Sequence, residues 1–291
     1  MDSLNTPQPA VRGPHGEGWP ALGLGTWRLG ERKADQAAEV RVIEDAIDIG
    51  YRVIDTAEMY GEGGAESVVG EALARALRKP GIAREQFRVV SKAYPHHASA
   101  SGLAQACAGS LRRLQLDTID LYLLHWRGDI PLADTVTGFV ALQQKGWIRY
   151  WGVSNFDSAD MSELFEQPGG AACAANQVYY SLRERGVEFD LLPWMRARAM
   201  PLMAYCPIDG GDLSRHKALE ALARPLGISA TQLAIAWLLH QPDVIAIPKA
   251  GSPAHLLENW QSREVKLAQS TLRAIDALFP PPKRWRRLAM R

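Results

Sequence analysis

The sequence lacks several features that mark special classes of protein. It has only three cysteines in 291 residues and no Cys-x-x-Cys pair, which argues against a disulfide framework or a zinc knuckle. No apolar run reaches the ~18 residues that a membrane-spanning helix needs. The first ten residues are polar and show no secretion signal. These absences lead us to expect a soluble, cytoplasmic protein with no membrane partner.

Charge of one sign is also scarce, because the formal net charge is only +1. We therefore expect no nucleic-acid partner. The end of the chain is locally basic, and we interpret it as a solvated tail in preference to a phosphate-binding patch. Its basic residues are Lys283, Arg284, Arg286, Arg287 and Arg291.

Short apolar runs alternate with stretches of helical periodicity along the whole chain. The runs predict eight buried strands, at residues 22–27, 51–55, 87–92, 119–125, 148–154, 173–178, 201–205 and 244–247. Apolar residues at helical spacing lie between most of them, and we expect the helix after the second strand to be entered through Ser67. Ser229 with Gln232 has the form of a capping box in front of a later helix. Strands that alternate with helices require a parallel sheet, and eight repeats favour closure into a barrel. We therefore predict one (β/α)8 TIM-barrel domain over residues 1–291.

Two further elements are predicted at the ends of this barrel. The glycine-rich residues 13–18 precede the first strand and have the composition of a hairpin turn. Residues 270–278 have apolar side chains on one stripe and are followed by three prolines, which indicates a short extra helix.

Polar side chains end nearly every predicted strand. Barrel active sites are built at the carboxyl ends of the strands, and burying charges without partners costs several kcal/mol. A site at the barrel mouth explains the coincidence better than seven separate structural roles. The residues in question are Asp55, Lys92, His125, Ser154 with Asn155, Gln177, Tyr205 and Lys249.

The sequence resembles the aldo-keto reductase family from about residue 11 to about residue 282. Each matching motif is weak alone, but their order is specific, and the chain is most similar to short bacterial members that reduce methylglyoxal or small aldehydes. The motifs are Gly25-Thr26-Trp27, residues 55–61, Ser91-Lys92, residues 123–126, residues 152–156, Asn176-Gln177, and residues 247–249 with Glu258-Asn259.

The resemblance implies a catalytic tetrad of Asp55, Tyr60, Lys92 and His125. Hydride addition to a carbonyl builds negative charge on its oxygen, so the site needs a proton donor and groups that stabilise this charge. Tyr60 would be the acid, the Lys92 cation would stabilise its phenolate, and Asp55 would keep Lys92 charged and fixed. A neutral His125 would orient the carbonyl, with proton relay as the alternative role. Substrate would contact Tyr60, His125 and two tryptophans, Trp27 and Trp126.

The cofactor expectation depends on the resemblance, because no Gly-x-Gly-x-x-Gly fingerprint follows a strand. Relatives bind nicotinamide without one, and matching positions imply NADPH, with NADH as a weaker alternative. Lys249 would meet the adenosine 2′-phosphate, although Ala250 and His255 stand where many relatives have serine and arginine. The implied contacts are Gly25, Thr26, Trp27, Asp55, Ser154, Asn155, Gln177, Tyr205, Cys206, Pro207, Ile208, Lys249, Ala250, His255, Glu258 and Asn259.

Two other functions compete with a reductase. A metal-dependent hydrolase would need clustered ligands, and His96-His97 is the wrong spacing for one metal, so we expect no metal. A nicotinamide-binding regulatory or sensor subunit stays open as the alternative, although an intact tetrad argues against it. Family resemblance leads us to expect a monomer with an open cleft for small carbonyl substrates.

Overall fold

The structure is a computed structural model that describes residues 9–13 and 16–291. These residues form two compact units. One is Leu24–Asn176, and the other joins the described residues up to Gly23 to Gln177–Arg291. Our expectation of a single domain over residues 1–291 stays a prediction, and residues 1–8 and 14–15 of that range lie outside the described part.

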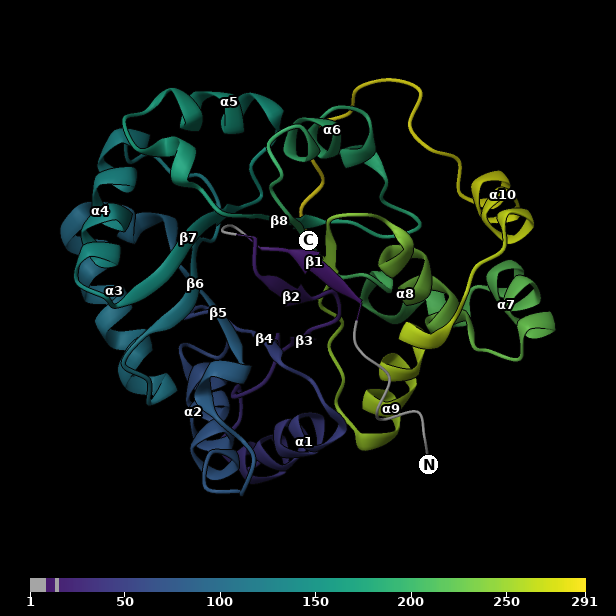
Figure 1. The fold of residues 1–291 in the computed structure, drawn as a ribbon, viewed down its shortest axis with the longest axis horizontal. Helices are drawn as coiled ribbons and strands as arrows, with labels where there is room; N and C mark the ends of the chain where they lie inside the picture. The colour runs from purple at the N-terminus through teal and green to yellow at the C-terminus, as the bar shows by residue number, and fades with distance from the viewer. Residues whose placement is uncertain (1–8, 14–15) are drawn as a thin grey trace. The chain divides into compact units, whose positions relative to one another are not determined.

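The unit Leu24–Asn176 is built on five parallel strands that neighbour one another in chain order. Helices lie along one side of these strands, as Figure 1 shows. The strands are β3 (Leu24–Gly25), β4 (Val53–Asp55), β5 (Arg88–Ala93), β6 (Ile119–Leu124) and β7 (Ile148–Ser154). The helices are α1 (Gln36–Ile49), α2 (Gly64–Ala76), α3 (Ala100–Leu114), α4 (Leu132–Gln144) and α5 (Ser158–Glu166).

The strands of this unit are apolar because helices and neighbouring side chains cover both of their faces. All six residues of β6 are buried, which is the pattern of a parallel strand. Helix α4 packs on β6 and β7 through Phe139, whose ring stacks on Trp151 at 5.1 Å and meets Tyr122 edge-on at 6.2 Å. This aromatic packing fixes the strands whose carboxyl ends carry the predicted polar residues.

The second unit contains the remaining three strands of the repeat, β8 (Asn176–Tyr179, which begins at the last residue of the first unit), β9 (Leu202–Tyr205) and β10 (Val244–Ala246). Strands β9 and β10 pair in parallel, and Leu22 forms a bridge with Ala246. The helices are α6 (Leu191–Arg196), α7 (Lys217–Ala223), α8 (Ala230–His240), α9 (Pro253–Gln261) and α10 (Gln269–Leu278). The antiparallel hairpin of β1 (Ala10–Arg12) and β2 (Gly18–Pro20) is present as predicted.

Local sequence signals explain several element ends in this unit. The capping box is confirmed, because the Ser229 hydroxyl accepts from the Gln232 N–H while the Gln232 side chain accepts from the Ser229 N–H. Arg185 holds α10 in place through a 2.8 Å contact with Asp276 and a hydrogen bond to the carbonyl of Phe279. The predicted extra helix is therefore present, and Arg185 fixes its C-terminal end.

Some boundaries differ from expectation. Helix α2 begins at Gly64, after the left-handed Gly63, and not at Ser67, whose hydroxyl donates to the Gly63 carbonyl. The predicted strand 173–178 begins only at Asn176. Single 3-10 turns lie at Arg84–Gln86, Pro95–His97, Gly170–Ala172, Gly186–Glu188, Arg224–Leu226 and Ser262–Glu264, and a longer 3-10 segment, kinked at Gly210 and Gly211, lies at Asp209–Arg215. Among the described residues no single helix is long and apolar enough to cross a membrane. The bent helix pair Lys217–Leu226 and Ala230–His240 has the combined length and apolar composition of a span.

Candidate active site

Lys92 lies at the centre of the predicted tetrad, fully buried on β5. Its ammonium is 2.8 Å from the Asp55 carboxylate, 2.9 Å from the carbonyl of Thr56 and 3.1 Å from the phenol oxygen of Tyr60. These three contacts match the three protons that an ammonium can donate. Burial lowers the pKa of Lys92, and the charge of Asp55 acts in the opposite direction. The carboxylate is thus the group that offsets the cost of placing this cation inside the protein.

Tyr60 lies on a tight turn between β4 and α2. The Tyr60 N–H donates to the Ala57 carbonyl at 3.1 Å, and the next three residues, Gly61, Glu62 and Gly63, all have left-handed backbone with φ between 51° and 86°. Glycine adopts this conformation without steric cost, which is why two of the three positions are glycine. The turn directs the phenol toward Lys92, whose ammonium is 4.7 Å from the ring centroid.

His125 follows β6 and faces Tyr60. The two rings meet edge-on with centroids 5.7 Å apart. Burial, and secondarily the Lys92 charge, lowers the pKa of His125 to about 2. The ring is therefore neutral at physiological pH. Its Nδ1 atom is buried without a hydrogen-bond partner among the described residues. The structure thus brings the four predicted catalytic residues together.

The two predicted substrate tryptophans have different surroundings. Trp126 is half-buried and its ring lies 5.0 Å from that of His125, so it borders the tetrad. Trp27 is 38% exposed on the loop after β3, where the guanidinium of Arg28 covers its ring at 4.6 Å. Trp126 is accordingly the stronger candidate for a wall beside the reacting carbonyl.

The predicted cofactor residues of this unit lie at the ends of β3 and β7. Gly25 ends β3, and the N–H and hydroxyl of Thr26 both donate to the carbonyl of Asp55 at 3.0 Å. Ser154 is buried at the end of β7. Asn155 has a left-handed backbone, and its amide donates to the His125 carbonyl at 3.0 Å and to the Ser154 hydroxyl at 3.1 Å. These segments are therefore bonded directly to the tetrad backbone.

In the second unit, Gln177 is the second residue of β8, and Tyr205 ends the neighbouring strand β9. Gln177 is buried on β8, with its amide nitrogen 3.9 Å from the Met203 sulfur. The Tyr205 ring stacks on Tyr179 with centroids 5.8 Å apart. Cys206 has a left-handed backbone and begins the loop that contains Pro207 and Ile208.

The last residue, Arg291, contacts this loop. The Arg291 N–H donates to the Tyr205 phenol oxygen at 3.2 Å, and its guanidinium pairs with Asp209 at 2.8 Å. Asp209 also accepts a hydrogen bond from the Tyr179 phenol and lies 3.1 Å from Arg183. The basic tail is exposed from Lys283 to Arg287, as expected, and Arg291 is also exposed although its guanidinium pairs with Asp209. No local sequence pattern joins residues this far apart.

The predicted phosphate and adenine residues surround the start of α9. Lys249 is exposed, Ala250 is buried, and His255 is exposed in the first helical turn. Asn259 is only 2% exposed, and the Glu258 carboxylate accepts from the Ser229 hydroxyl at 2.6 Å. Lys249 and His255 are therefore the members of this group that are open to a charged ligand.

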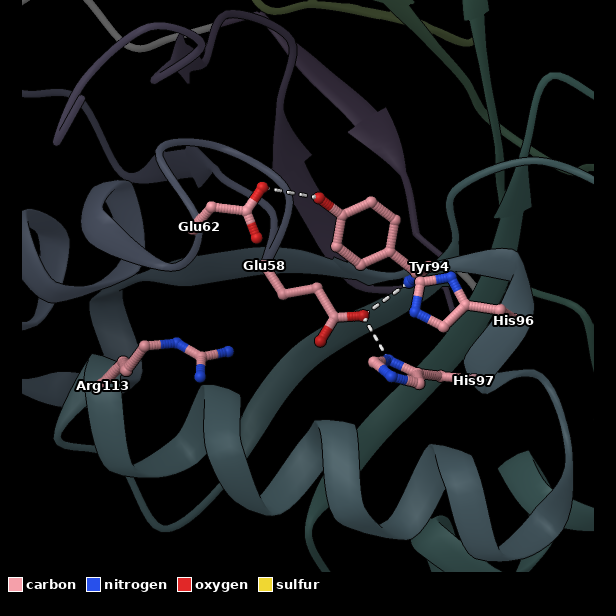
Figure 2. A pocket seen from close by; sticks show the side chains of 6 residues that line it. All are labelled: Glu58, Glu62, Tyr94, His96, His97 and Arg113. Atoms are coloured by element: carbon pink, nitrogen blue, oxygen red, sulfur yellow. Dashed lines mark hydrogen bonds and ion pairs between the residues drawn. The ribbon is translucent and has the colours of Figure 1, made fainter.

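Sequence reasoning missed a hollow of about 450 Å³ beside the Tyr60 turn. Glu58, Glu62, Tyr94, His96, His97 and Arg113 line it (Figure 2). No sequence signal pointed to these residues as a group, because they come from two loops and one helix. Over the described residues, no three His, Cys, Asp or Glu side chains are placed to hold a metal ion.

A family model described as the aldo/keto reductase family matches residues 21–279. The chain therefore belongs to the aldo/keto reductase family, and the predicted enzyme class is confirmed. It is 45% identical to methylglyoxal reductase YeaE of Escherichia coli (strain K12), over 91% of this chain and 92% of that protein. It is 31% identical to glyoxal reductase of Bacillus subtilis (strain 168), over 89% and 88% of the two chains.

A solved relative confirms the predicted (β/α)8 fold class. The crystal structure of an aldo/keto reductase from Klebsiella pneumoniae in complex with NADP and acetate superimposes with a TM-score of 0.92 at 45% identity. The match covers 98% of this chain and 100% of that one.

Proposed function

We propose that this protein reduces small aldehydes and ketones with NADPH and that Tyr60 is the proton donor. One observation carries the proposal: the Lys92 ammonium contacts both the Tyr60 phenol and the Asp55 carboxylate, beside the neutral ring of His125. These are the groups that carbonyl reduction needs, an acid, a cation beside it, and a neutral donor for the substrate oxygen.

Each residue has a distinct part in the proposed reaction. A reduced nicotinamide, when bound, supplies hydride to the carbonyl carbon. The Tyr60 phenol gives its proton to the carbonyl oxygen as negative charge develops there. A free phenol has a pKa near ~10, so the adjacent Lys92 cation eases the transfer by stabilising the phenolate. Asp55 holds Lys92 in place, and an N–H of neutral His125 orients the substrate oxygen.

The residues present fit an NADPH cofactor, judged by their donor chemistry. The Lys249 ammonium lies next to Gly251, because a Cβ on that glycine would be 3.5 Å from it, and α9 begins two residues later. An ammonium beside a helix N-terminus suits the adenosine 2′-phosphate. Ser154, Asn155 and Gln177 offer amide and hydroxyl groups for the carboxamide, and Tyr205 offers an aromatic face. His255 in place of arginine weakens the preference over NADH, since a neutral imidazole makes no bidentate contact.

The proposed substrate class is supported by the activities of two relatives and by the apolar ring of Trp126 beside the tetrad. The two curated relatives described above are a methylglyoxal reductase and a glyoxal reductase. Trp126 offers an apolar wall for a small dicarbonyl or an aromatic aldehyde. We further propose that the protein is cytoplasmic and monomeric.

A panel of carbonyl compounds, followed at the NADPH absorbance band, tests the proposal. We expect turnover with methylglyoxal and nitrobenzaldehyde, faster with NADPH than with NADH at equal low concentration. Tyr60→Phe should remove most turnover, by at least about 10²-fold, and leave NADPH binding intact. Binding of NADPH without turnover of any carbonyl would support the sensor alternative and contradict the reductase. Unchanged turnover in Tyr60→Phe would contradict the acid assignment.

A further inference from the structure

Two carboxylates flank the catalytic tyrosine in the sequence and hold opposite ends of another tyrosine in space. Glu58 and Glu62 stand two residues before and two residues after Tyr60, and Tyr94 stands two residues after Lys92. Glu58 accepts the backbone N–H of Tyr94 at 2.6 Å, while Glu62 accepts its phenol proton at 3.2 Å. Figure 2 shows Tyr94 between the two carboxylates. The loop of the proposed acid is thereby joined to the segment that follows its lysine.

Glu58 makes the stronger of these two ties. Its own N–H donates to the carbonyl of Lys92 at 3.2 Å, and its carboxylate also contacts Nδ1 of His97 at 2.9 Å. The side chain is only 7% exposed, whereas the bond from Tyr94 to Glu62 lies at the surface. A hydrogen bond from a backbone N–H to a buried carboxylate is about twice as strong as a neutral one. Glu58 thus binds the segment around Lys92 at three points.

The Tyr60 turn needs such external ties. Its three left-handed residues, 61–63, belong to neither a helix nor a strand, and the backbone bonds that close the turn, such as Glu62 N–H to Met59 and Gly64 N–H to Gly61, join it only to itself. An error of about 1 Å in the position of a catalytic group costs on the order of 10²-fold in rate. The separation of the Tyr60 oxygen from the Lys92 ammonium, 3.1 Å, therefore depends on how firmly the turn is fixed to β5.

The hollow itself does not have the character of a ligand site. The charged groups that line it already have hydrogen-bond partners. Glu58 is bonded to Tyr94 and His97, Glu62 is bonded to Tyr94, and Arg113 is bonded to Glu66 at 2.6 Å. Two carboxylates at its edge would repel an anion, and Arg113 would repel a cation. The cluster is better suited to fixing loops than to binding a molecule.

We propose that Glu58 is a positioning residue that sets the Tyr60 phenol against the Lys92 ammonium, with Tyr94 and Glu62 as a second, weaker tie. This role rests on the proposed reductase function. Glu58 acts through the backbone on both sides, at Lys92 and at Tyr94, and its carboxylate need not contact the substrate.

The test compares Glu58→Ala, Glu58→Gln and Tyr94→Phe with Glu163→Gln, which removes a surface carboxylate paired with Arg127 in the same unit. We expect Glu58→Ala to lower kcat about tenfold or more, to leave KM for NADPH within about twofold, and to shift the pH profile of kcat. Glu58→Gln should restore most of kcat, because its amide oxygen still accepts the Tyr94 N–H. Tyr94→Phe should lower kcat only about two- to threefold, and Glu163→Gln should match the wild type.

Hydrogen exchange of residues 57–63 gives a second readout. It should quicken in Glu58→Ala and not in the Glu163→Gln control. If Glu58→Ala fails to fold, the other two variants still test the proposal. A wild-type kcat in Tyr94→Phe overturns it. A fall in kcat of about tenfold or more in Glu58→Gln, the loss expected for Glu58→Ala, overturns it too. An active wild type whose Glu58→Ala loses only thermal stability, with kcat and pH profile unchanged, overturns it as well. A wild type that reduces no carbonyl contradicts the reductase function itself, and the positioning role with it.

Discussion

The side-chain amide of Asn155 donates to the backbone carbonyl of His125 at 3.0 Å. Asn155 follows β7 and is predicted to hold the nicotinamide carboxamide, whereas His125 follows β6 and is predicted to orient the substrate oxygen. The hydrogen bond joins these two segments directly. The predicted cofactor segment and the predicted substrate segment are thus linked through the side chain of Asn155. The backbone of Asn155 is left-handed, a conformation that asparagine tolerates better than most residues.

Replacing Lys92 with methionine should affect stability and turnover together. The substitution leaves the buried carboxylate of Asp55 without its cation, which costs about 3–5 kcal/mol in the free energy of unfolding. Turnover should fall at least about 10²-fold, since the cation beside the acid is gone. Urea unfolding and NADPH oxidation measure the two effects.

The double variant Lys92→Met with Asp55→Asn is the control for that prediction. Removing both charges should recover much of the lost stability while turnover stays low. A double variant no more stable than Lys92→Met alone would show that the ion pair is not the source of the loss.

His125 predicts a specific dependence of stability on pH. Its pKa in the folded protein is about 2, below the ordinary 6.5. Below pH 6.5 the imidazole therefore binds a proton in the unfolded chain but not in the folded protein. The neutral His125 ring therefore lowers stability progressively, through this difference in proton binding, as the pH falls below 6.5, and it causes no such loss above pH 6.5. Between pH 7 and pH 5 this loss amounts to about 2 kcal/mol.

Urea unfolding of the wild type and of His125→Gln at pH 7 and pH 5 measures this contribution. The variant should lose less stability than the wild type over that interval. Equal losses in the two proteins would mean that His125 takes up its proton in the folded state as readily as in the unfolded chain.

The cofactor preference should depend on Lys249 and His255. Lys249→Ala removes a charge-assisted contact, worth about 1.5–3 kcal/mol, and should raise KM for NADPH about tenfold or more while KM for NADH changes little. His255→Arg should lower KM for NADPH by adding a guanidinium at the same phosphate. Lys266→Ala, at an exposed lysine of the same unit, is the matched control. Equal effects of Lys249→Ala on the two cofactors would place the 2′-phosphate elsewhere.

Alanine substitutions at two glycines with nearly equal φ distinguish backbone strain from steric clash. Gly30 has φ of 71° and Gly146 has φ of 72°, but a Cβ on Gly30 would lie 2.1 Å from the backbone of Gly64, whereas one on Gly146 would meet nothing within 4 Å. Gly146→Ala should cost about 1–2 kcal/mol of stability through the left-handed backbone alone. Gly30→Ala should cost at least about 2 kcal/mol more and reduce turnover, because Gly64 closes the loop that carries Tyr60. Similar thermal unfolding midpoints in the two variants would argue against the close backbone contact.

The strands could be predicted from local rules, because buried parallel strands are continuous apolar runs. The polar residues Asp55, Lys92 and His125 stood out because they lie within one residue of the carboxyl ends of strands, where a barrel places its site, and the family resemblance then implied the tetrad with Tyr60. The start of α2 was misplaced because Gly63 caps it with backbone geometry and no side-chain oxygen, so the polar Ser67 gave a false signal.

The missed contacts share a physical cause. The bond from Tyr94 to Glu58 and the ion pair of Arg291 with Asp209 join residues 36 and 82 positions apart. Neither pair has a spacing that periodicity or a motif would reveal, since both arise from tertiary folding of loops. Tyr94 and Arg291 could be found only once the loops had been placed.

All four tetrad residues belong to the unit Leu24–Asn176, while Lys249, His255 and Tyr205 belong to the other. On the proposed assignment of Lys249 and His255 to the 2′-phosphate, substitutions that change nucleotide preference would fall in a different unit from the tetrad. On the same assignment, the preference between NADPH and NADH could diverge among relatives while the four tetrad residues stay unchanged.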